Sequence, residues 1–372
     1  MMTFSTENLN NVFAEEGKYE NFKKLCFDLM HGNDIYEYDK DGVEKRVSKQ
    51  EANKAIRKVF MDVCGLSESD LNSRKKRKRA EEAHKHEIFE IIEEVIDFKI
   101  AEGYSESEWF NAFVDGRNLA LGDAQEFTTE SKALFVVGDY SGDNHDITMQ
   151  QLPAGKSEIV KTSPKTIKIG KDIDLIILGR VDFAKWIDKI ADSYVQYVQA
   201  MTYDMVQTAA DKLPALFKGT GTLAAGTKDD FDELIENVEA YNGGNVVIMG
   251  TKVALKKITA LADVTWASDS QKDAIATTGR LGNYEGTMLV EIPQKIKMGS
   301  LTGEKLFSNN ILLIMPVTED KFIKFVDEGE TEIFEVTEKA DLVDDFETYE
   351  VSRRIGAAVV LGQYFGQWKF QA

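Results

Sequence analysis

Residues 182–212, DFAKWIDKIADSYVQYVQAMTYDMVQTAADK, decide how the rest of the chain is interpreted. Apolar side chains recur there at steps of three or four residues, which is the period of one face of an α-helix: Phe183, Ile187, Ile190, Tyr194, Val198, Met201 and Met205. Pro214 ends the pattern, because proline cannot continue a helix. A helix of about 30 residues is roughly 45 Å long, more than an ordinary globular helix. The pattern therefore predicts one long helix that serves as a spine.

The chain after this helix predicts an α/β layer. Residues 231–241 and 251–262 have helical periodicity, and the apolar run at 245–250 between them predicts a buried strand. Further apolar runs predict strands at Gly286–Ile292, Ile311–Pro316 and Phe322–Val326, and two closing strands within Phe346–Phe370. Helices and strands come in blocks, so the predicted class is α+β.

The region before the spine predicts strands and hairpins. Short apolar stretches alternate with turns that contain glycine or proline: Ala133–Val137, Ile147–Met149, Glu158–Lys161 and Thr166–Ile169. Polar residues outnumber apolar ones across residues 110–177. We therefore expect much of this region to project from the core.

The first hundred residues predict a mainly helical region. Residues 7–30 and 48–63 look like amphipathic helices, and the turn at Asp39–Gly42 between them suggests a small hairpin. A long, highly charged helix is predicted from Glu68 to about Glu102, with Ser67 as its N-cap. The apolar residues of that helix lie in its second half, so we expect the first half to be exposed or covered by a partner.

Composition limits the kind of partner. The 372 residues, 43% of them apolar, can bury one large core or two joined ones. The formal net charge of -19 disfavours a surface that wraps nucleic acid broadly. Residues 319–350 hold thirteen acids and three lysines, a net charge of -10. We interpret that stretch as a solvated or mutually repelling surface.

Cysteine usage and the N-terminus suggest an aqueous, reducing compartment. The only cysteines, Cys26 and Cys64, give no disulfide framework, and both are expected to be structural. The start, MMTFSTENLN, has no basic segment followed by an apolar run, and no apolar stretch approaches the roughly 18 residues of a membrane span. No membrane partner is expected.

Searches for a catalytic, metal or cofactor site end without a candidate. Gly244, Gly250, Thr251 and Lys252 have the wrong spacing and order for a phosphate-binding loop. The four histidines are too scattered for a zinc site: His31, His84, His86 and His145. Ser141 lacks the glycine that a nucleophile elbow has two residues earlier. The sequence therefore favours a protein that is not an enzyme and has no cofactor.

Six consecutive cations, RKKRKR, stand on the first half of the long charged helix: Arg74, Lys75, Lys76, Arg77, Lys78 and Arg79. One interpretation is a solvated helix start neutralised by Asp70, Glu81 and Glu82 or by acids of a neighbouring subunit. The other is a contact with DNA or with a scaffold protein. The sequence leaves both open.

Three segments, taken in order, resemble the major capsid protein of tailed bacteriophages, which has the Hong Kong 97-type fold. NVVIMGTKVALKKITAL (residues 245–261) is similar to the strand and helix of the axial domain. GRLGNYEGTMLVEIP (279–293) is similar to the glycine-rich segment and strand that follow. FETYEVSRRIGAAVVLGQYFGQWKF (346–370) is similar to the final strands of the peripheral domain. The resemblance covers roughly residues 110–372.

The resemblance implies a domain plan. Residues 1–110 would form a helical N-terminal arm or scaffold-like region, which some family members lose by proteolysis. Residues 111–180 would hold the extended loop and its flanking strands. Residues 181–212 with 344–372 would form the peripheral domain with the spine helix, and residues 213–343 the axial domain.

It also implies surfaces between subunits. The extended loop, about residues 125–170, would lie over a neighbouring subunit, with contacts and a conceivable isopeptide crosslink from Lys132, Lys156 or Lys161. Arg353 and Arg354 would be contact residues of the peripheral domain. Hexamers and pentamers of the chain would build an icosahedral shell around double-stranded DNA, with portal, scaffold and decoration proteins as partners. Assembly would take place in the host bacterial cytoplasm, and the product would be a virion capsid.

Three other functions stay open at this point. An encapsulin-type nanocompartment shares the fold but encloses cargo enzymes, and genomic neighbours would separate the two. A soluble α+β enzyme or ligand-binding protein could assemble a site from residues far apart in sequence, and would form a small oligomer with a ligand-filled pocket. A nucleic-acid-binding protein built around Arg74–Arg79 is disfavoured by the net charge of -19.

Overall fold

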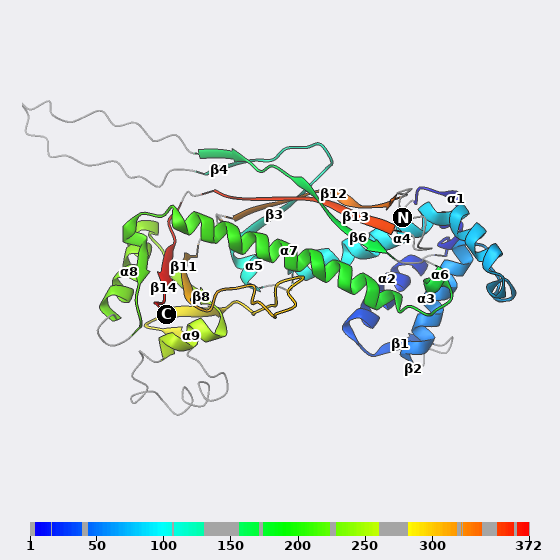
Figure 1. Cartoon of the computed structure of the whole chain (residues 1–372), viewed down its shortest axis with the longest axis horizontal. Coiled ribbons are helices and arrows are strands. Elements are labelled where there is room, and N and C mark those ends of the chain that lie inside the picture. Colours follow the sequence, from blue (N-terminus) through cyan, green and yellow to red (C-terminus); the bar gives the residue numbers. More distant parts are fainter. Residues whose placement is uncertain are drawn as a thin grey trace, which may run out of the picture. The chain divides into compact units, whose positions relative to one another are not determined.

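The chain forms two compact units. Unit 1 comprises Met1–Glu106, Ser163–Gln196 and Glu328–Ile355, and unit 2 comprises Ser107–Thr162, Tyr197–Asp327 and Gly356–Ala372. The computed structural model in Figure 1 describes residues 4–15, 17–38, 44–105, 108–129, 156–170, 174–223, 228–259, 282–317, 321, 323–336, 348–360 and 363–371.

Unit 1 begins with helices that pack around aromatic side chains. These are α1 (Glu7–Val12), α2 (Lys18–His31) and α3 (Lys49–Val63). Residues 7–30 were predicted as one helix, but Gly17, with φ 81°, interrupts it, a conformation that glycine adopts without steric cost. Phe60 of α3 lies edge-on to Phe183 with 4.9 Å between ring centroids. The predicted hairpin is confirmed as β1 (Ile35–Tyr38) and β2 (Glu44–Val47).

The long charged helix starts later than predicted. Residues 68–72 form a 3₁₀ turn, η1 (Glu68–Asn72), in which Ser67 and Asp70 make a capping box. The α-helix, α4 (Arg74–Ser105), begins after it and has a break in its dihedral angles at His84. Its second half is buried as expected, through Ile88, Ile91, Ile92, Val95 and Ile96.

The predicted spine is confirmed as the 29-residue helix α7 (Phe183–Asp211), preceded by the short α6 (Asp174–Ile177). Residues 183–196 of α7 belong to unit 1 and residues 197–211 to unit 2. In unit 1 the hydroxyl of Tyr194 donates to the carbonyl oxygen of Val351 at 2.5 Å. This bond fixes α7 to a strand that lies more than 150 positions later in the sequence.

A four-stranded sheet has the order β3-β12-β13-β6. Its strands are β3 (Val114–Leu119), β6 (Ser163–Gly170), β12 (Ile323–Val336) and β13 (Thr348–Val359). β13 and β6 are antiparallel, with Tyr349 opposite Ile169. β12 is much longer than the predicted strand 322–326, and it takes in part of the acidic stretch. The expectation that this stretch is solvated was wrong for Asp327 and Glu328, which are 2% and 7% exposed.

Unit 2 contains a six-stranded sheet of order β7-β14-β11-β8-β10-β9. Its strands are β7 (Lys218–Thr220), β8 (Val246–Gly250), β9 (Asn283–Tyr284), β10 (Thr287–Glu291), β11 (Ile311–Pro316) and β14 (Gly366–Lys369). The predicted strand 245–250 is confirmed as β8, whose five residues are all buried. β8 is parallel to β10 and antiparallel to β11.

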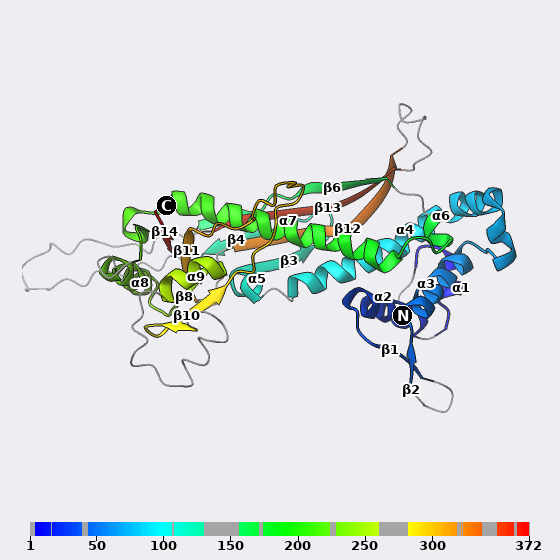
Figure 2. The same ribbon diagram turned by 60° about the horizontal axis from the view of Figure 1, so that its bottom comes forward.

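Two helices and α7 cover this sheet. Helix α8 (Lys228–Asn242) contacts β11, β14 and β7, and α9 (Lys252–Thr259) contacts β8, β10 and β11. Trp368 packs edge-on against Phe231 of α8, at 5.3 Å between centroids. The next residue back, Gln367, donates to Gln207 of α7 at 2.8 Å. Adjacent residues of a strand point to opposite faces, so α7 and α8 lie on opposite faces of the sheet (Figure 2).

A separate two-stranded ladder joins β4 (Glu126–Thr129) to β5 (Lys156–Ile159), with Phe127 opposite Glu158. Helix α5 (Glu108–Phe113) precedes β3. The predicted strand 166–169 is confirmed within the longer β6, and the predicted strand 158–161 is shifted by two residues, to β5. The predicted strands Ala133–Val137 and Ile147–Met149 lie outside the described residues.

In the part of the chain that the structure describes, no helix combines the length and the apolar character needed to cross a membrane. Cys26 and Cys64 are both buried free thiols.

Candidate assembly surfaces

The base of the β4–β5 ladder is held by one aromatic ring between two cations. Phe127 is 3% exposed and packs in a small core with Val160, Val326 and Val360. The Arg117 guanidinium lies 4.9 Å and the Lys324 ammonium 5.5 Å from its ring centroid. Cations are attracted to an aromatic ring face, and the attraction grows when water is excluded. Phe127 therefore anchors the ladder to the core of unit 2.

We expect Phe127→Leu to destabilise this anchor by about 1 to 2 kcal/mol, because it removes both cation–ring contacts and part of the buried volume. Urea unfolding measures the loss, and limited proteolysis around residues 126–159 should become faster. Ile159→Leu is the matched control, since Ile159 lies on the same ladder but is 54% exposed. Equal effects of the two substitutions would contradict the anchor.

The three candidate lysines of the extended loop fall in different places. Lys161 is described and exposed, and it lies between β5 and β6. Lys156 is the first residue of β5, where only the backbone is described. Lys132 lies outside the described residues. Their contact with a neighbouring subunit stays a prediction.

The basic run forms the first turns of α4, and its six members are not equivalent. Five are exposed, but Arg77 is 7% exposed and donates to the carbonyl of Leu71, so the interpretation as six exposed cations was wrong at that position. Lys76 pairs with Asp70 at 2.5 Å, and this bond lowers the pKa of Asp70 to about 2. Helix N-termini carry partial positive charge, so cations there are unfavourable without an anion nearby.

Arg353 and Arg354 point to different environments. Arg353 is 7% exposed, and its Nη1 donates to the Asp97 carboxylate and, at 2.8 Å, to the hydroxyl of Thr331. Arg354 is exposed. Alternation along β13 explains the difference, because Val351, Arg353 and Ile355 share the buried face. Arg353 is thus an internal tie between α4, β12 and β13, and only Arg354 remains available for a contact with a neighbour.

Two carboxylates of α4, which sequence reasoning missed, hold backbone N–H groups of β12. The backbone N–H of Thr331 donates to Asp97 at 3.2 Å, and that of Ile333 donates to Glu93 at 2.6 Å. Carboxylate oxygens of α4 thus accept hydrogen bonds from alternate residues of β12, as the carbonyl groups of a neighbouring strand would. Burial first, and then the nearby Asp97, Glu332 and Glu90, raise the pKa of Glu93 to about 7, against the lowering effect of the bond from Ile333.

This raised pKa gives the packing of α4 a pH dependence. The pKa of Glu93 is about 7 in the folded chain and 4.5 for an ordinary glutamate, so folding takes up a proton between these two pH values. The stabilisation is complete below about pH 4.5 and is lost as the pH rises through 7. We expect unfolding free energy to be about 1 to 2 kcal/mol higher at pH 5.5 than at pH 8, after allowance for solvent screening.

The substitution Glu93→Gln should remove this part of the pH dependence, because glutamine keeps the acceptor oxygen but does not titrate. Urea unfolding at both pH values measures it. Glu82→Gln is the control on the same helix, since Glu82 is exposed. An unchanged pH slope in Glu93→Gln would show that another group carries it.

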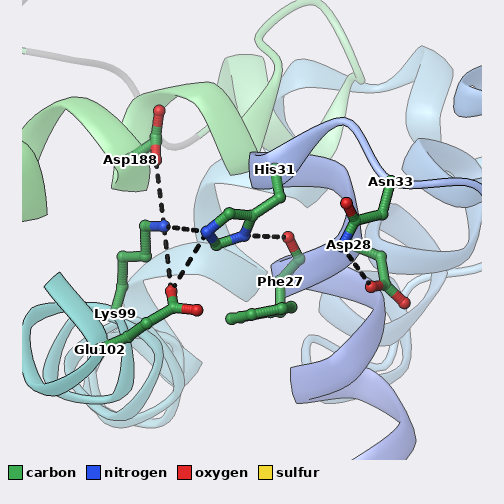
Figure 3. Close-up of polar contacts among 7 residues, drawn as sticks. All are labelled: Phe27, Asp28, His31, Asn33, Lys99, Glu102 and Asp188. Atoms are coloured by element: carbon green, nitrogen blue, oxygen red, sulfur yellow. Dashed lines mark hydrogen bonds and ion pairs between the residues drawn. The ribbon is translucent and has the colours of Figure 1, made fainter. Parts of the chain in front are cut away.

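A second polar cluster joins α2, α4 and α7 inside unit 1 (Figure 3). Lys99, 8% exposed, donates to His31 Nε2 at 2.9 Å and to Glu102 at 3.1 Å, and it lies 3.9 Å from Asp188. His31 Nε2 also lies 3.4 Å from Glu102, and its Nδ1 lies 3.1 Å from the Phe27 carbonyl oxygen. Burial raises the pKa of Asp188. One buried ammonium thus connects the N-terminal helices to α7.

The polar contacts of unit 1 join helices to one another and to strands. Among the described residues, no group of three or more histidine, cysteine, aspartate or glutamate side chains could hold a metal ion. The polar clusters tie helices to strands, and a projecting ladder and charged helix faces remain at the surface. The fold is of the α+β class predicted from the sequence.

The chain belongs to the family described as "SPbeta prophage-derived putative capsid protein YonB", which matches residues 21–369. It is therefore a phage-type capsid protein, a virion component and not an enzyme. The family confirms the predicted resemblance to phage capsid subunits, and it removes the soluble enzyme from the open alternatives. No curated protein sequence matches the chain.

Solved shell structures resemble the chain at low identity. A virus-like particle from Pyrococcus furiosus is 10% identical over 74% of this chain and 98% of that chain, with a TM-score of 0.44. The capsid of cyanophage P-SCSP1u is 15% identical over 70% and 88%, with a TM-score of 0.42. The mature capsid of bacteriophage PhiM1 is 9% identical over 70% and 86%, with a TM-score of 0.47.

Proposed function

We propose that this chain is the major capsid subunit, many copies of which form an icosahedral head around a double-stranded phage genome. The observation that carries the proposal is the combination of a capsid family match over residues 21–369 with a β4–β5 ladder whose described side chains are all exposed except Phe127. A ladder of two strands is at best marginally stable in water, so a surface to pack against would stabilise it. A neighbouring copy supplies that surface.

The proposed assembly uses hexamers and pentamers of one chain. The long helix α7 and the strands β12 and β13 run through both units. They serve as the frame of the subunit in hexamers and in pentamers alike. The residues 111–180 would contribute the extended loop, with Lys132, Lys156 and Lys161 at its contacts, and Arg354 would contact a neighbour from β13. Denaturing gels of assembled shells test for an isopeptide bond. The bond appears as a series of covalent multimers, which Lys161→Arg, or the same change at Lys132 or Lys156, abolishes.

The basic run is proposed to meet an anionic partner on the inner side of the shell, either packaged DNA or a scaffold protein. Three of its exposed members are available for a first test: Lys75, Lys78 and Arg79. Their joint change to glutamine should weaken double-stranded DNA binding by tenfold or more at low salt and flatten its salt dependence. The reason is that binding releases fewer counterions from the DNA when fewer phosphates are contacted. Filter binding or fluorescence anisotropy at several salt concentrations measures this.

The control for that experiment is Lys54→Gln with Lys58→Gln, which removes exposed charges from α3. Loss of binding by both sets would mean that net charge alone matters. Retained DNA binding with a failure to form heads would point to the scaffold instead.

The direct test of the proposed function is negative-stain electron microscopy with light scattering, on the purified chain and after coexpression with its genomic neighbours. Closed shells, or rings of five or six subunits, are expected. Nuclease-protected DNA inside shells separates a phage head from an encapsulin-type compartment, which would hold protein cargo. A small monodisperse oligomer under every condition would refute the proposal.

A further inference from the structure

The connection between β10 and β11 folds back on itself as a hairpin at residues 295–306. The backbone N–H of Lys297 donates to the carbonyl of Glu304 at 2.8 Å, and that of Leu306 donates to the carbonyl of Lys295 at 2.8 Å. A β-bridge between Ile296 and Lys305 lies between these bonds. We call this segment the 295–306 hairpin.

The base of the hairpin is fixed to unit 2. The side-chain amide of Gln294 accepts from the backbone N–H of Phe307 at 3.0 Å and donates to its carbonyl at 2.8 Å, as a paired strand residue would. Phe307, 2% exposed, packs edge-on against Tyr203 of α7 at 4.9 Å, and the Tyr203 hydroxyl accepts from the N–H of Ser308. The hairpin is therefore held in place and not merely a surface loop.

Its outer part exposes apolar side chains among cations. Leu301 is 103% exposed, Ile296 61% and Met298 43%. Three lysines and one glutamate give residues 295–306 a charge of +2, in a chain of net charge -19. A fixed element that presents several apolar side chains to water is typical of a protein–protein contact. Its positive charge favours an acidic partner.

A surface of matching character lies on α8 of the same unit. Four carboxylates line its exposed side: Asp229, Asp230, Glu233 and Glu236. Among the described residues no cation forms an ion pair with any of these four within 4.0 Å. A hollow of about 300 Å³ lies beside them, lined by Leu216, Asp230, Glu233, Leu234 and Trp368 with neighbouring residues of β7. Its lining combines these carboxylates with Leu216, which is 58% exposed, and it also includes the exposed Lys218 of β7.

The two surfaces face away from each other within one copy. The hairpin base packs on Tyr203 of α7, whereas α8 covers the opposite face of the six-stranded sheet, as Gln367 and Trp368 show. A hairpin can therefore meet an α8 surface only in a second copy. Contacts of this head-to-tail kind close into rings when the rotation between copies permits.

We propose that the 295–306 hairpin of one copy binds the acidic face of α8 in the next copy, with Leu301 in the hollow and its lysines against Asp230 and Glu233. This inference rests on the proposed function, since it names the contact through which copies of unit 2 assemble. The hairpin contributes the apolar anchor Leu301 and positive charge, and α8 contributes the pocket and negative charge.

Charge reversal tests the pairing. We expect Lys297→Glu with Lys305→Glu to reduce closed shells or rings at least tenfold, counted by electron microscopy, and Asp230→Lys with Glu233→Lys to do the same. Combining all four reversals should restore assembly to within about twofold of the unchanged chain, because opposite charges again face each other. Lys54→Glu with Lys58→Glu on α3 is the control for the change in net charge. Circular dichroism checks that each variant is folded.

Disulfide trapping gives a second readout that does not depend on charge. Copies carrying Leu301→Cys are mixed with copies carrying Glu233→Cys and oxidised during assembly. A crosslinked dimer that contains one of each is expected, whereas neither variant alone should crosslink. Cys26 and Cys64, 0% and 4% exposed, give little background.

The outcomes separate the two levels of inference. Shells without crosslinks, or without rescue by the combined reversal, overturn the hairpin contact and leave the capsid function in place. If the unchanged chain forms neither shells nor rings with its genomic neighbours, the proposed function fails. Crosslinks together with rescue support both.

Discussion

Replacing Arg353 by methionine is expected to lower the unfolding free energy of the chain by about 3 kcal/mol. Arg353 is 7% exposed and is the cation that the Asp97 carboxylate pairs with, while Asp97 also accepts from the backbone of Thr331. Methionine fills similar volume but leaves a partly buried carboxylate without its counter-charge, next to Glu93. Urea unfolding followed by circular dichroism measures the loss.

The adjacent residue provides the control. Arg354 is exposed on the other face of β13, so Arg354→Met should change the unfolding free energy by no more than about 0.5 kcal/mol. It should instead affect assembly, if Arg354 contacts a neighbour. Similar losses of stability from the two substitutions would mean that the Asp97 contact contributes little.

Changing Gly356 to alanine is expected to cost about 3 kcal/mol, at the upper end of overpacking effects. A Cβ atom at this position would stand 2.4 Å from the carbonyl oxygen of Lys161 and 3.0 Å from Cα of Thr162. Both are backbone atoms, which cannot rotate away as a flexible side chain would. The chain entering β6 would have to separate from β13, which would also disturb the base of the extended loop.

Thermal unfolding and shell yield measure this effect together. Gly116→Ala is the matched control in the same sheet, because its Cβ would meet only Phe325 at an ordinary 3.7 Å. Gly116→Ala should be neutral or slightly stabilising. A stable, assembling Gly356→Ala variant would show that the 161–162 backbone can move without cost.

The elements that could be predicted are those whose pattern is local. The three- and four-residue spacing from Phe183 onward gave α7, and the apolar run at 245–250 gave β8. The turn around residues 39–42 gave the β1–β2 hairpin. In each case the side chains that define the element lie within one helical turn or one strand of each other.

Errors arose where the sequence pattern alone does not settle the kind of helix or the burial of a side chain. The start of α4 was misplaced because Ser67 is an N-cap, as predicted, but of the 3₁₀ turn η1 and not of the α-helix. β12 was predicted too short because Asp327 and Glu328 count as surface residues in any sequence pattern, whereas the fold buries both. Acidic residues are rarely buried without compensating contacts, and those contacts come from other parts of the chain.

The same limit applied to the candidate contacts. Nothing in RKKRKR distinguishes Arg77, which bonds to the Leu71 carbonyl, from its exposed neighbours. Nothing in SRR distinguishes Arg353 from Arg354 until the facing of β13 is known. Glu93, Asp97 and Phe127 were not singled out, since a glutamate-rich helix and a lone phenylalanine in a polar loop carry no signal of their own.

The sequence by itself determined the α+β class, the spine helix, the absence of a recognisable catalytic motif and the resemblance to phage capsid proteins, because periodicity, turn residues and motif order are written in adjacent positions. Only the tertiary structure decided which charges are internal ties and which face outward, and which apolar side chains remain at the surface of the 295–306 hairpin. The physical reason is that burial and ion pairing depend on residues such as Asp97 and Arg353, which are 256 positions apart in the chain and meet only after folding.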